Sequence, residues 1–196
     1  MGRIFCIMGK SSTGKDTIYK ALLKDDALDL HRIIPYTTRP IRQGEQDGQE
    51  YFFVDETAVK QYQEENRIIE MRTYDTCFGP WRYFTVNDNR IDLDNQNYLV
   101  IGTPEAYLSI CRYYGKEKVS PILIELDDGI RLQRALNREK KQAVPKYDEM
   151  CRRYLADDKD FAEEKLKECE IDVRFYNDKL DHCIAKITKY ISNHCE

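Results

Sequence analysis

The sequence predicts an α/β protein in three layers, with a central parallel sheet and helices on both of its faces. Short apolar runs alternate along the chain with longer amphipathic stretches, which is the pattern of strand–helix units. Such units need right-handed crossovers, and these make neighbouring strands parallel. The 196 residues suit one domain, and no Pro/Gly/Ser-rich linker divides them. We therefore expect a single domain over residues 1–196.

The first strand–helix unit lies at the start of the chain. A strand is expected over 3–8 because this apolar run ends at Gly9, and a helical pattern begins near Lys15 after a small-residue loop. The apolar face of this helix consists of Ile18, Ala21 and Leu22.

Later units are punctuated by helix caps. Residues 98–101 form an apolar strand, after which Thr103 is placed as an N-cap, Pro104 as the first helical residue and Gly115 as the helix stop. The remaining elements expected in this part are a strand over 119–126, a helix over 128–141, a helical region over 147–170, a strand over 172–176 and a final helix through Leu180, Ile184, Ile187 and Ile191.

Residues 37–90 depart from this rhythm. Here short strands are expected over 51–54, 67–74 and 82–86, with one helix over 55–66. We interpret the segment as a small mixed α/β insert beside the main sheet.

Composition and charge exclude several classes of protein. A hydrophobic content of 41% with 34% charged residues indicates a soluble globular chain rather than a disordered one. The formal charge of −4 provides no general attraction for a nucleic-acid backbone. The apolar run 4–8 is too short for a signal peptide or a membrane span. Seven cysteines form an odd set without a C-x-x-C pair, as expected of free thiols. We expect a cytoplasmic protein without membrane or nucleic-acid partners, and the oligomeric state stays open.

A phosphate-binding loop is predicted between the first strand and the first helix. Residues 9–15 match G-x-x-x-x-G-K, in which small residues let backbone N–H groups surround a phosphate while Lys15 and the helix N-terminus add positive charge. A Gly-rich turn that only connects two elements is the alternative. The residues expected to bind ATP here are Gly9, Ser11, Ser12, Thr13, Gly14, Lys15, Asp16 and Thr17.

Asp16 departs from the usual motif, where Ser or Thr offers a hydroxyl to Mg²⁺. Thr17 comes one position late. Because a carboxylate is a good ligand for a hard cation, Asp16 is the candidate Mg²⁺ ligand.

The segment 36–54 resembles the nucleoside-monophosphate-binding segment of guanylate kinases. This resemblance implies a three-layer P-loop kinase fold that uses ATP and Mg²⁺ to phosphorylate GMP, with a core of about 1–36, 97–130 and 154–196, an acceptor-binding insert of about 37–90 and a helical lid of about 131–153. The residues that carry the resemblance are Thr37-Thr38-Arg39, Arg42, Gly44-Glu45, Gly48, Tyr51 and Phe53-Val54.

Two arginines and a tyrosine form the candidate acceptor-phosphate site. Guanidinium groups and a phenol suit a dianionic phosphate, so Arg39, Arg42 and Tyr51 are able to converge on one, although a solvated hairpin is the alternative. The resemblance assigns the acceptor phosphate to these three residues. It also places Thr38 in the acceptor site.

Glu70 matches the glutamate by which guanylate kinases read guanine. A carboxylate accepts the N1–H and N2 amine of guanine but opposes the N1 acceptor of adenine; an exposed strand glutamate is the alternative. The resemblance adds Phe78 and Gly79 to the acceptor site, yet Pro80-Trp81 lacks the usual hydroxyl residue and Gly102 replaces an aspartate. Another purine monophosphate or a deoxynucleotide therefore remains a possible acceptor.

The lid helix carries a basic stripe. Its members recur at helical spacing, and arginines on a closing lid neutralise the moving phosphoryl group; a solvated helix face is the alternative. The resemblance assigns catalytic roles to Arg134, Arg138 and Arg153, the last with Arg152 as the alternative register, beside Lys15 and Arg39. It places Asn177 at the adenine, although Asn177-Asp178 also suits an ordinary helix cap. The stripe consists of Arg131, Arg134, Arg138 and Lys141.

The function expected from these features is ATP-dependent phosphoryl transfer to a nucleoside monophosphate, giving ADP and GDP from ATP and GMP. Two alternatives stay open. One is a kinase for another phosphorylated acceptor, such as a deoxynucleotide or a sugar phosphate. The other is a non-catalytic module of the same fold that binds a protein.

Overall fold

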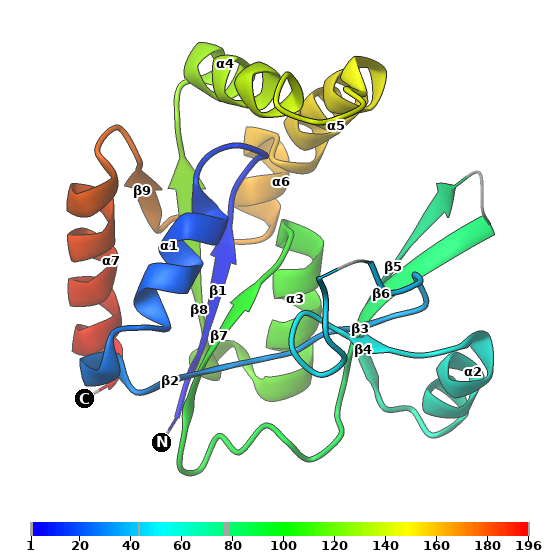
Figure 1. Ribbon diagram of the computed structural model, residues 1–196. Coiled ribbons are helices and arrows are strands. Elements are labelled where there is room, and N and C mark those ends of the chain that lie inside the picture. The colour runs from blue at the N-terminus through cyan, green and yellow to red at the C-terminus, as the bar shows by residue number, and fades with distance from the viewer. Residues whose placement is uncertain (1, 43, 77–78, 196) are drawn as a thin grey trace.

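A five-stranded parallel sheet lies at the centre of the computed structural model, which describes residues 2–42, 44–76 and 79–195 (Figure 1). All of its neighbouring strands are parallel, as predicted. The middle strand is buried over its whole length because it has a neighbour on each edge and helices on each face. In spatial order the strands are β2 (Leu30–Arg32), β7 (Asn97–Ile101), β1 (Ile4–Met8), β8 (Val119–Glu125) and β9 (Arg174–Tyr176).

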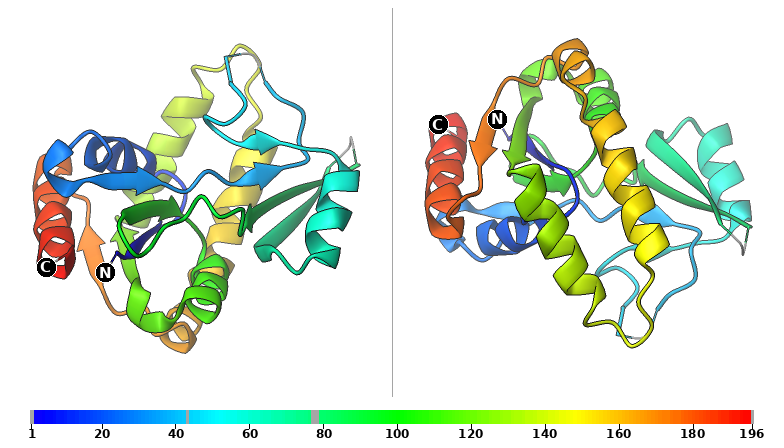
Figure 2. Two further views of the ribbon diagram at one scale, coloured as in Figure 1. Left: turned by 90° about the horizontal axis from the view of Figure 1, so that it is seen from below. Right: turned by 90° about the horizontal axis from the view of Figure 1, so that it is seen from above.

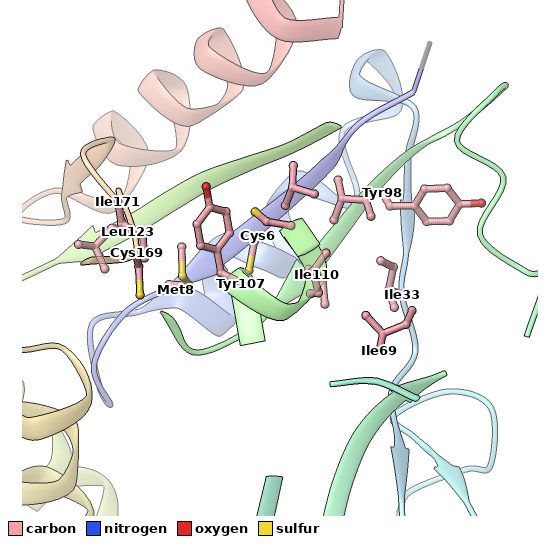
Figure 3. Close-up of a cluster of buried hydrophobic side chains, with 14 of the residues drawn as sticks. Cys6, Met8, Ile33, Ile69, Tyr98, Tyr107, Ile110, Leu123, Cys169 and Ile171 are labelled. Carbon is pink, nitrogen blue, oxygen red and sulfur yellow. The ribbon is translucent and has the colours of Figure 1, made fainter. Parts of the chain in front are cut away.

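Helices cover both faces of this sheet, and alternation along β1 sorts its side chains between them. Cys6 and Met8 join the cluster shown in Figure 3, which lies under α3 (Pro104–Tyr114) and α6 (Glu163–Glu168). Phe5 and Ile7 pack on the other face against α1 (Lys15–Leu22) and α7 (Leu180–Cys195). The three-layer prediction is confirmed. No helix in the described ranges combines the length and hydropathy needed to cross a bilayer.

Two predicted elements differ in extent. The helical region expected over 147–170 is two helices, α5 (Tyr147–Asp160) and α6, because Phe161 turns inward and is buried at the break between them. The expected strand 172–176 contains only β9. By contrast, the caps of α3 are confirmed: Thr103 Oγ1 accepts a hydrogen bond from the N–H of Ala106, and Gly115 ends the helix at φ +95°.

The insert is a second, mixed sheet with its own core, as predicted. Tyr36, Val59 and Phe84 pack together where α2 (Glu56–Glu64) covers the sheet. Figure 2 shows this unit beside the central sheet, away from α7. Its strands, in spatial order, are β4 (Phe52–Phe53), β3 (Tyr36–Thr37), β6 (Gly79–Val86) and β5 (Ile68–Thr76).

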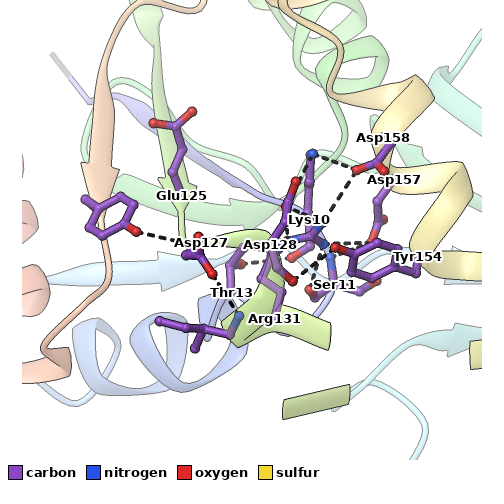
Figure 4. Close-up of polar contacts among 12 residues, drawn as sticks. Lys10, Ser11, Thr13, Glu125, Asp127, Asp128, Arg131, Tyr154, Asp157 and Asp158 are labelled. Carbon is purple, nitrogen blue, oxygen red and sulfur yellow. Dashed lines mark hydrogen bonds and ion pairs between the residues drawn. The ribbon is translucent and has the colours of Figure 1, made fainter. Parts of the chain in front are cut away.

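A buried arginine ties the lid helices to the phosphate loop. Arg131 on α4 (Asp128–Glu139) is completely buried, although it was expected on the exposed basic stripe. Its guanidinium lies 2.7 Å from Asp128, 3.7 Å from Asp157 and 3.5 Å from Asp158, and it donates a hydrogen bond to the carbonyl of Ser11 (Figure 4). A cation out of water needs such partners. The contact therefore fixes α4, α5 and the loop relative to one another.

Replacing Arg131 with methionine should lower the free energy of unfolding by about 3–5 kcal/mol, because it leaves carboxylates without their buried cation. Urea unfolding measures the loss. Arg152→Met is the matched control: Arg152 is 60% exposed and pairs with Glu149 on its own helix, so its loss should stay within about 1 kcal/mol. Equal losses for the two variants would show that the Arg131 contacts do not hold the fold together.

Candidate active site

The predicted phosphate loop joins β1 to α1 and is held from both sides. Gly14 adopts φ +95°, and a Cβ there would lie 2.5 Å from Nδ2 of Asn177. A Cβ at Gly9 would lie 2.6 Å from the carbonyl oxygen of Ile124 on β8. Both positions therefore require glycine on steric grounds. The hydroxyl of Thr13 donates to the carbonyl of Lys10, which closes the turn of the loop.

The loop leads directly into the N-terminus of α1. Lys15 is half-buried at the first helical position, whereas Asp16 and Thr17 are exposed. The first N–H groups of a helix have no partner within it, and the helix dipole makes this end positive. The predicted order of strand, loop and helix is confirmed, and anion binding by the loop stays a prediction.

Carboxylates of α5 contact the other half of the loop. Asp157 accepts a hydrogen bond of 2.7 Å from the N–H of Ser11, and Asp158 pairs with Nζ of Lys10 at 2.7 Å (Figure 4). Sequence reasoning missed both aspartates. The sequence signal that could have identified them is their spacing: both follow Arg153 by about one helical turn on α5.

Asn177 connects the loop to the end of β9. Its Nδ2 donates to the carbonyl of Thr13 at 2.7 Å, and its backbone N–H donates to Glu125. Its side chain therefore does not act as the ordinary helix cap that sequence also allowed. Within the described ranges the buried Oδ1 of Asn177 has no hydrogen-bond partner. A buried acceptor of this kind suits a ligand that donates a hydrogen bond.

The lid arginines differ in their surroundings. Arg134 and Arg138 are exposed on α4, and Nη1 of Arg134 lies 3.9 Å from the position of a Cβ at Gly14. Arg153 is exposed on α5 and lies 3.4 Å from Glu149. The lid turn is closed where Glu139 accepts a hydrogen bond from the N–H of Lys146. Of these cations, Arg134 is thus placed next to the phosphate loop.

In the insert, Arg39 is held by an internal carboxylate. Its side chain is only 3% exposed, and its guanidinium makes two hydrogen bonds to Glu45, at 2.8 and 3.0 Å. These bonds hold the pKa of Glu45 below its usual range. The ring of Tyr51 lies 5.5 Å from the guanidinium carbon. Arg42 is exposed, and its backbone N–H also donates to Glu45.

Thr38 also lies in this part of the insert, where its hydroxyl accepts a hydrogen bond from the backbone N–H of Arg82. Phe78 lies outside the described residues. Gly79 begins β6 with φ +100°. Thr38, which directly precedes Arg39, is therefore held against β6 by its hydrogen bond with Arg82.

Glu70 is a buried carboxylate on β5, not an exposed strand residue. Its Oε1 accepts a hydrogen bond from Thr85 at 3.0 Å, and its Oε2 accepts one from Nε of Arg72 at 3.2 Å. Gly102 packs closely on β1, since a Cβ there would lie 3.1 Å from Sγ of Cys6. Burial raises the pKa of the Cys6 thiol, which keeps it neutral.

The last turn of α5 separates the phosphate loop from the pocket beside Glu70. Asp157 and Asp158 reach the loop, whereas Asp160 lines a cavity of about 280 Å³ together with Arg72 and Thr103. The phosphate loop and the cavity lined by Arg72 therefore lie at the same end of α5. Among the described residues, no three His, Cys, Asp or Glu side chains gather as a metal centre.

Comparisons with known proteins agree with this geometry. The sequence model of the guanylate kinase family matches residues 1–83. The guanylate kinase of Syntrophomonas wolfei is 30% identical over 210 residues, covering 97% of this chain and 91% of that one; the Porphyromonas gingivalis enzyme is 27% identical, covering 98% and 97%. The crystal structure of Anaplasma phagocytophilum guanylate kinase has the same fold, with a TM-score of 0.67, 18% identity and coverage of 99% and 86%. The chain belongs to the guanylate kinase family.

Proposed function

We propose that the protein transfers the γ-phosphoryl group of ATP to GMP, giving ADP and GDP. The observation that carries this proposal is that one end of α5 contacts the phosphate loop and also borders a cavity lined by Arg72, whose Nε donates to the buried carboxylate Glu70. Membership of the guanylate kinase family supports the same reaction. The acceptor phosphate is itself the nucleophile, so the protein acts by aligning and neutralising two anions.

On the donor side, the loop and the start of α1 bind the ATP phosphates. The N–H groups of Thr13 and Thr17 already donate to the carbonyls of Lys10 and Gly14, so the N–H groups of 12 and 14–16 and the ammonium of Lys15 are the donors proposed for the phosphates. The unpaired Oδ1 of Asn177 is an acceptor for the 6-amine of adenine, and Arg134 lies beside the loop. Ser11 contributes little through its N–H, because Asp157 already accepts that hydrogen bond.

Mg²⁺ accompanies ATP in this proposal. Asp16 is an exposed carboxylate directly after Lys15, and such a donor set suits Mg²⁺, which takes one or two carboxylates together with phosphate oxygens and water. Asp16 would hold the ion. When bound, the ion neutralises charge on the phosphates.

On the acceptor side, Arg42 and Tyr51 bind the phosphate of GMP, with Thr38 beside them. Arg39 forms the floor of this site, because its guanidinium is buried against Glu45 and Tyr51. Arg138 and Arg153 are exposed on the lid helices and neutralise the moving phosphoryl group when the lid closes. Alignment of two reactants in this way lowers a barrier by about 7–11 kcal/mol.

A second candidate acceptor follows from two departures from the family pattern. Gly102 supplies no carboxylate, and Pro80-Trp81 replaces the usual hydroxyl residue. A kinase for a deoxynucleotide or another phosphorylated acceptor would share the donor site and differ only in this pocket.

An ADP-release assay over a panel of acceptors should give the highest kcat/KM with GMP. The panel contains GMP, dGMP, IMP, AMP, CMP, UMP and a sugar phosphate, each with ATP and Mg²⁺. AMP, CMP and UMP should be poor acceptors, because the hydrogen-bonding edges of their bases do not match a carboxylate placed for guanine. Preference for a sugar phosphate, or no turnover with any member, would contradict the proposal.

Replacing Lys15 with alanine should nearly abolish turnover, reducing kcat/KM by about 100- to 1,000-fold, because it removes the side-chain cation from the phosphate loop. Thermal unfolding should stay near that of the parent protein. Lys20→Ala is the matched control, since Lys20 is exposed in the last turn of the same helix and should tolerate the change. Retained activity in Lys15→Ala would exclude this loop as the donor site.

A further inference from the structure

Arg72 places a cation against the carboxylate expected to read the base. Both residues lie on the same face of β5, and Nε of Arg72 donates to Oε2 of Glu70. The Glu70 side chain is 5% exposed and that of Arg72 is 27% exposed, so the pair lies at the inner edge of the site. Thr85 occupies one lone pair of the other carboxylate oxygen. Each oxygen keeps a second lone pair for a ligand.

The same arginine lines an open space. The cavity of about 280 Å³ is bounded by β5 on one side and by the start of α3 on the other. Arg72 therefore borders both Glu70 and the cavity. Nε is used on Glu70, whereas a guanidinium carries further N–H donors on its two terminal nitrogens. The lining residues used here are Met71, Arg72, Thr103 and Pro104.

Two positions at which guanylate kinases usually carry polar side chains do not supply them in this chain. Position 102 is glycine and supplies no carboxylate; a Cβ there would lie 3.1 Å from Sγ of Cys6. Positions 80 and 81 are Pro and Trp, so neither offers a hydroxyl. Arg72 is the cation that lies against Glu70, and it brings the donors that this pocket needs for a base with an exocyclic oxygen.

We propose that Arg72 determines base specificity, donating a hydrogen bond to the 6-oxo oxygen of a purine while Glu70 accepts from N1–H and the 2-amine. This inference rests on the proposed function and names its substrate class, the 6-oxopurine nucleoside monophosphates. Guanine presents an acceptor at O6 and donors at N1 and N2, which match one guanidinium and one carboxylate. Hypoxanthine lacks only the 2-amine, so IMP is a weaker member of the class.

The test compares GMP with 6-thio-GMP, in which a sulfur that accepts hydrogen bonds weakly replaces O6 while N1–H and the 2-amine remain. The parent protein should prefer GMP by about tenfold in kcat/KM. Arg72→Met should bring the ratio of the two kcat/KM values close to one, because the donor that distinguishes them is gone. A ratio near one in the parent protein would overturn the proposal.

Arg82→Met is the matched control. Arg82 is also 27% exposed and pairs with a glutamate, Glu56, but it points to α2. In Arg82→Met, the ratio of kcat/KM for GMP to kcat/KM for 6-thio-GMP should equal that of the parent protein. If Arg72→Met lowers kcat/KM equally for both nucleotides, Arg72 only positions Glu70 and the proposal is wrong.

An unstable variant and an inactive parent protein have different consequences for the proposal. If Arg72→Met is too unstable to purify, Arg72→Val, which also lacks a hydrogen-bond donor and suits a β-strand better, should show the same fall in the ratio of the two kcat/KM values. An unchanged ratio in that variant overturns the proposal. If the parent protein phosphorylates neither nucleotide, the proposed function itself fails, and the loss is seen before any variant is compared.

Discussion

The buried guanidinium of Arg131 is the contact on which the geometry of the site depends. It joins the carbonyl of Ser11 in the phosphate loop to carboxylates at the start of α4 and near the end of α5. Because a buried cation is costly to separate from its anions, these three elements form one unit. Arg131 therefore fixes the ends of α4 and α5 that lie next to the phosphate loop.

Internal ion pairs orient the site before any substrate arrives. Asp158 holds Lys10, Glu45 holds Arg39, and Glu70 pairs with Arg72. In each pair a carboxylate restricts a long cationic side chain that would otherwise sample many rotamers. Such preorganisation reduces the rearrangement needed when anionic groups bind.

Sequence alone predicted the elements whose signals are local. Periodicity and small-residue punctuation identified β1, the phosphate loop and α1, and cap residues framed α3 at both ends. The break at Phe161 was missed because helical periodicity runs on across it, and only packing against the sheet shows that this ring turns inward. The edge strand β2 was missed because three residues carry too little pattern.

The candidate site shows the same division. The loop glycines Gly9 and Gly14 were predictable because motif and steric requirement coincide in a few consecutive residues. Arg131 was assigned to an exposed stripe because helical spacing does not show what covers a face, and its partners Asp157 and Asp158 come 26 and 27 residues later. The contact between Arg72 and Glu70 was likewise missed. Residues two apart on a strand share a face, but the sequence does not show which cavity that face borders.

The most direct test of the central claim, that donor and acceptor phosphates meet across the end of α5, is calorimetric binding of one molecule in which adenosine and guanosine are joined by five phosphates. If both sites are engaged at once, this molecule should bind at least 100-fold more tightly than ATP, because the second contact becomes intramolecular. Binding no tighter than that of ATP would contradict the claim, since it would mean that the two sites are not within reach of a single phosphate chain.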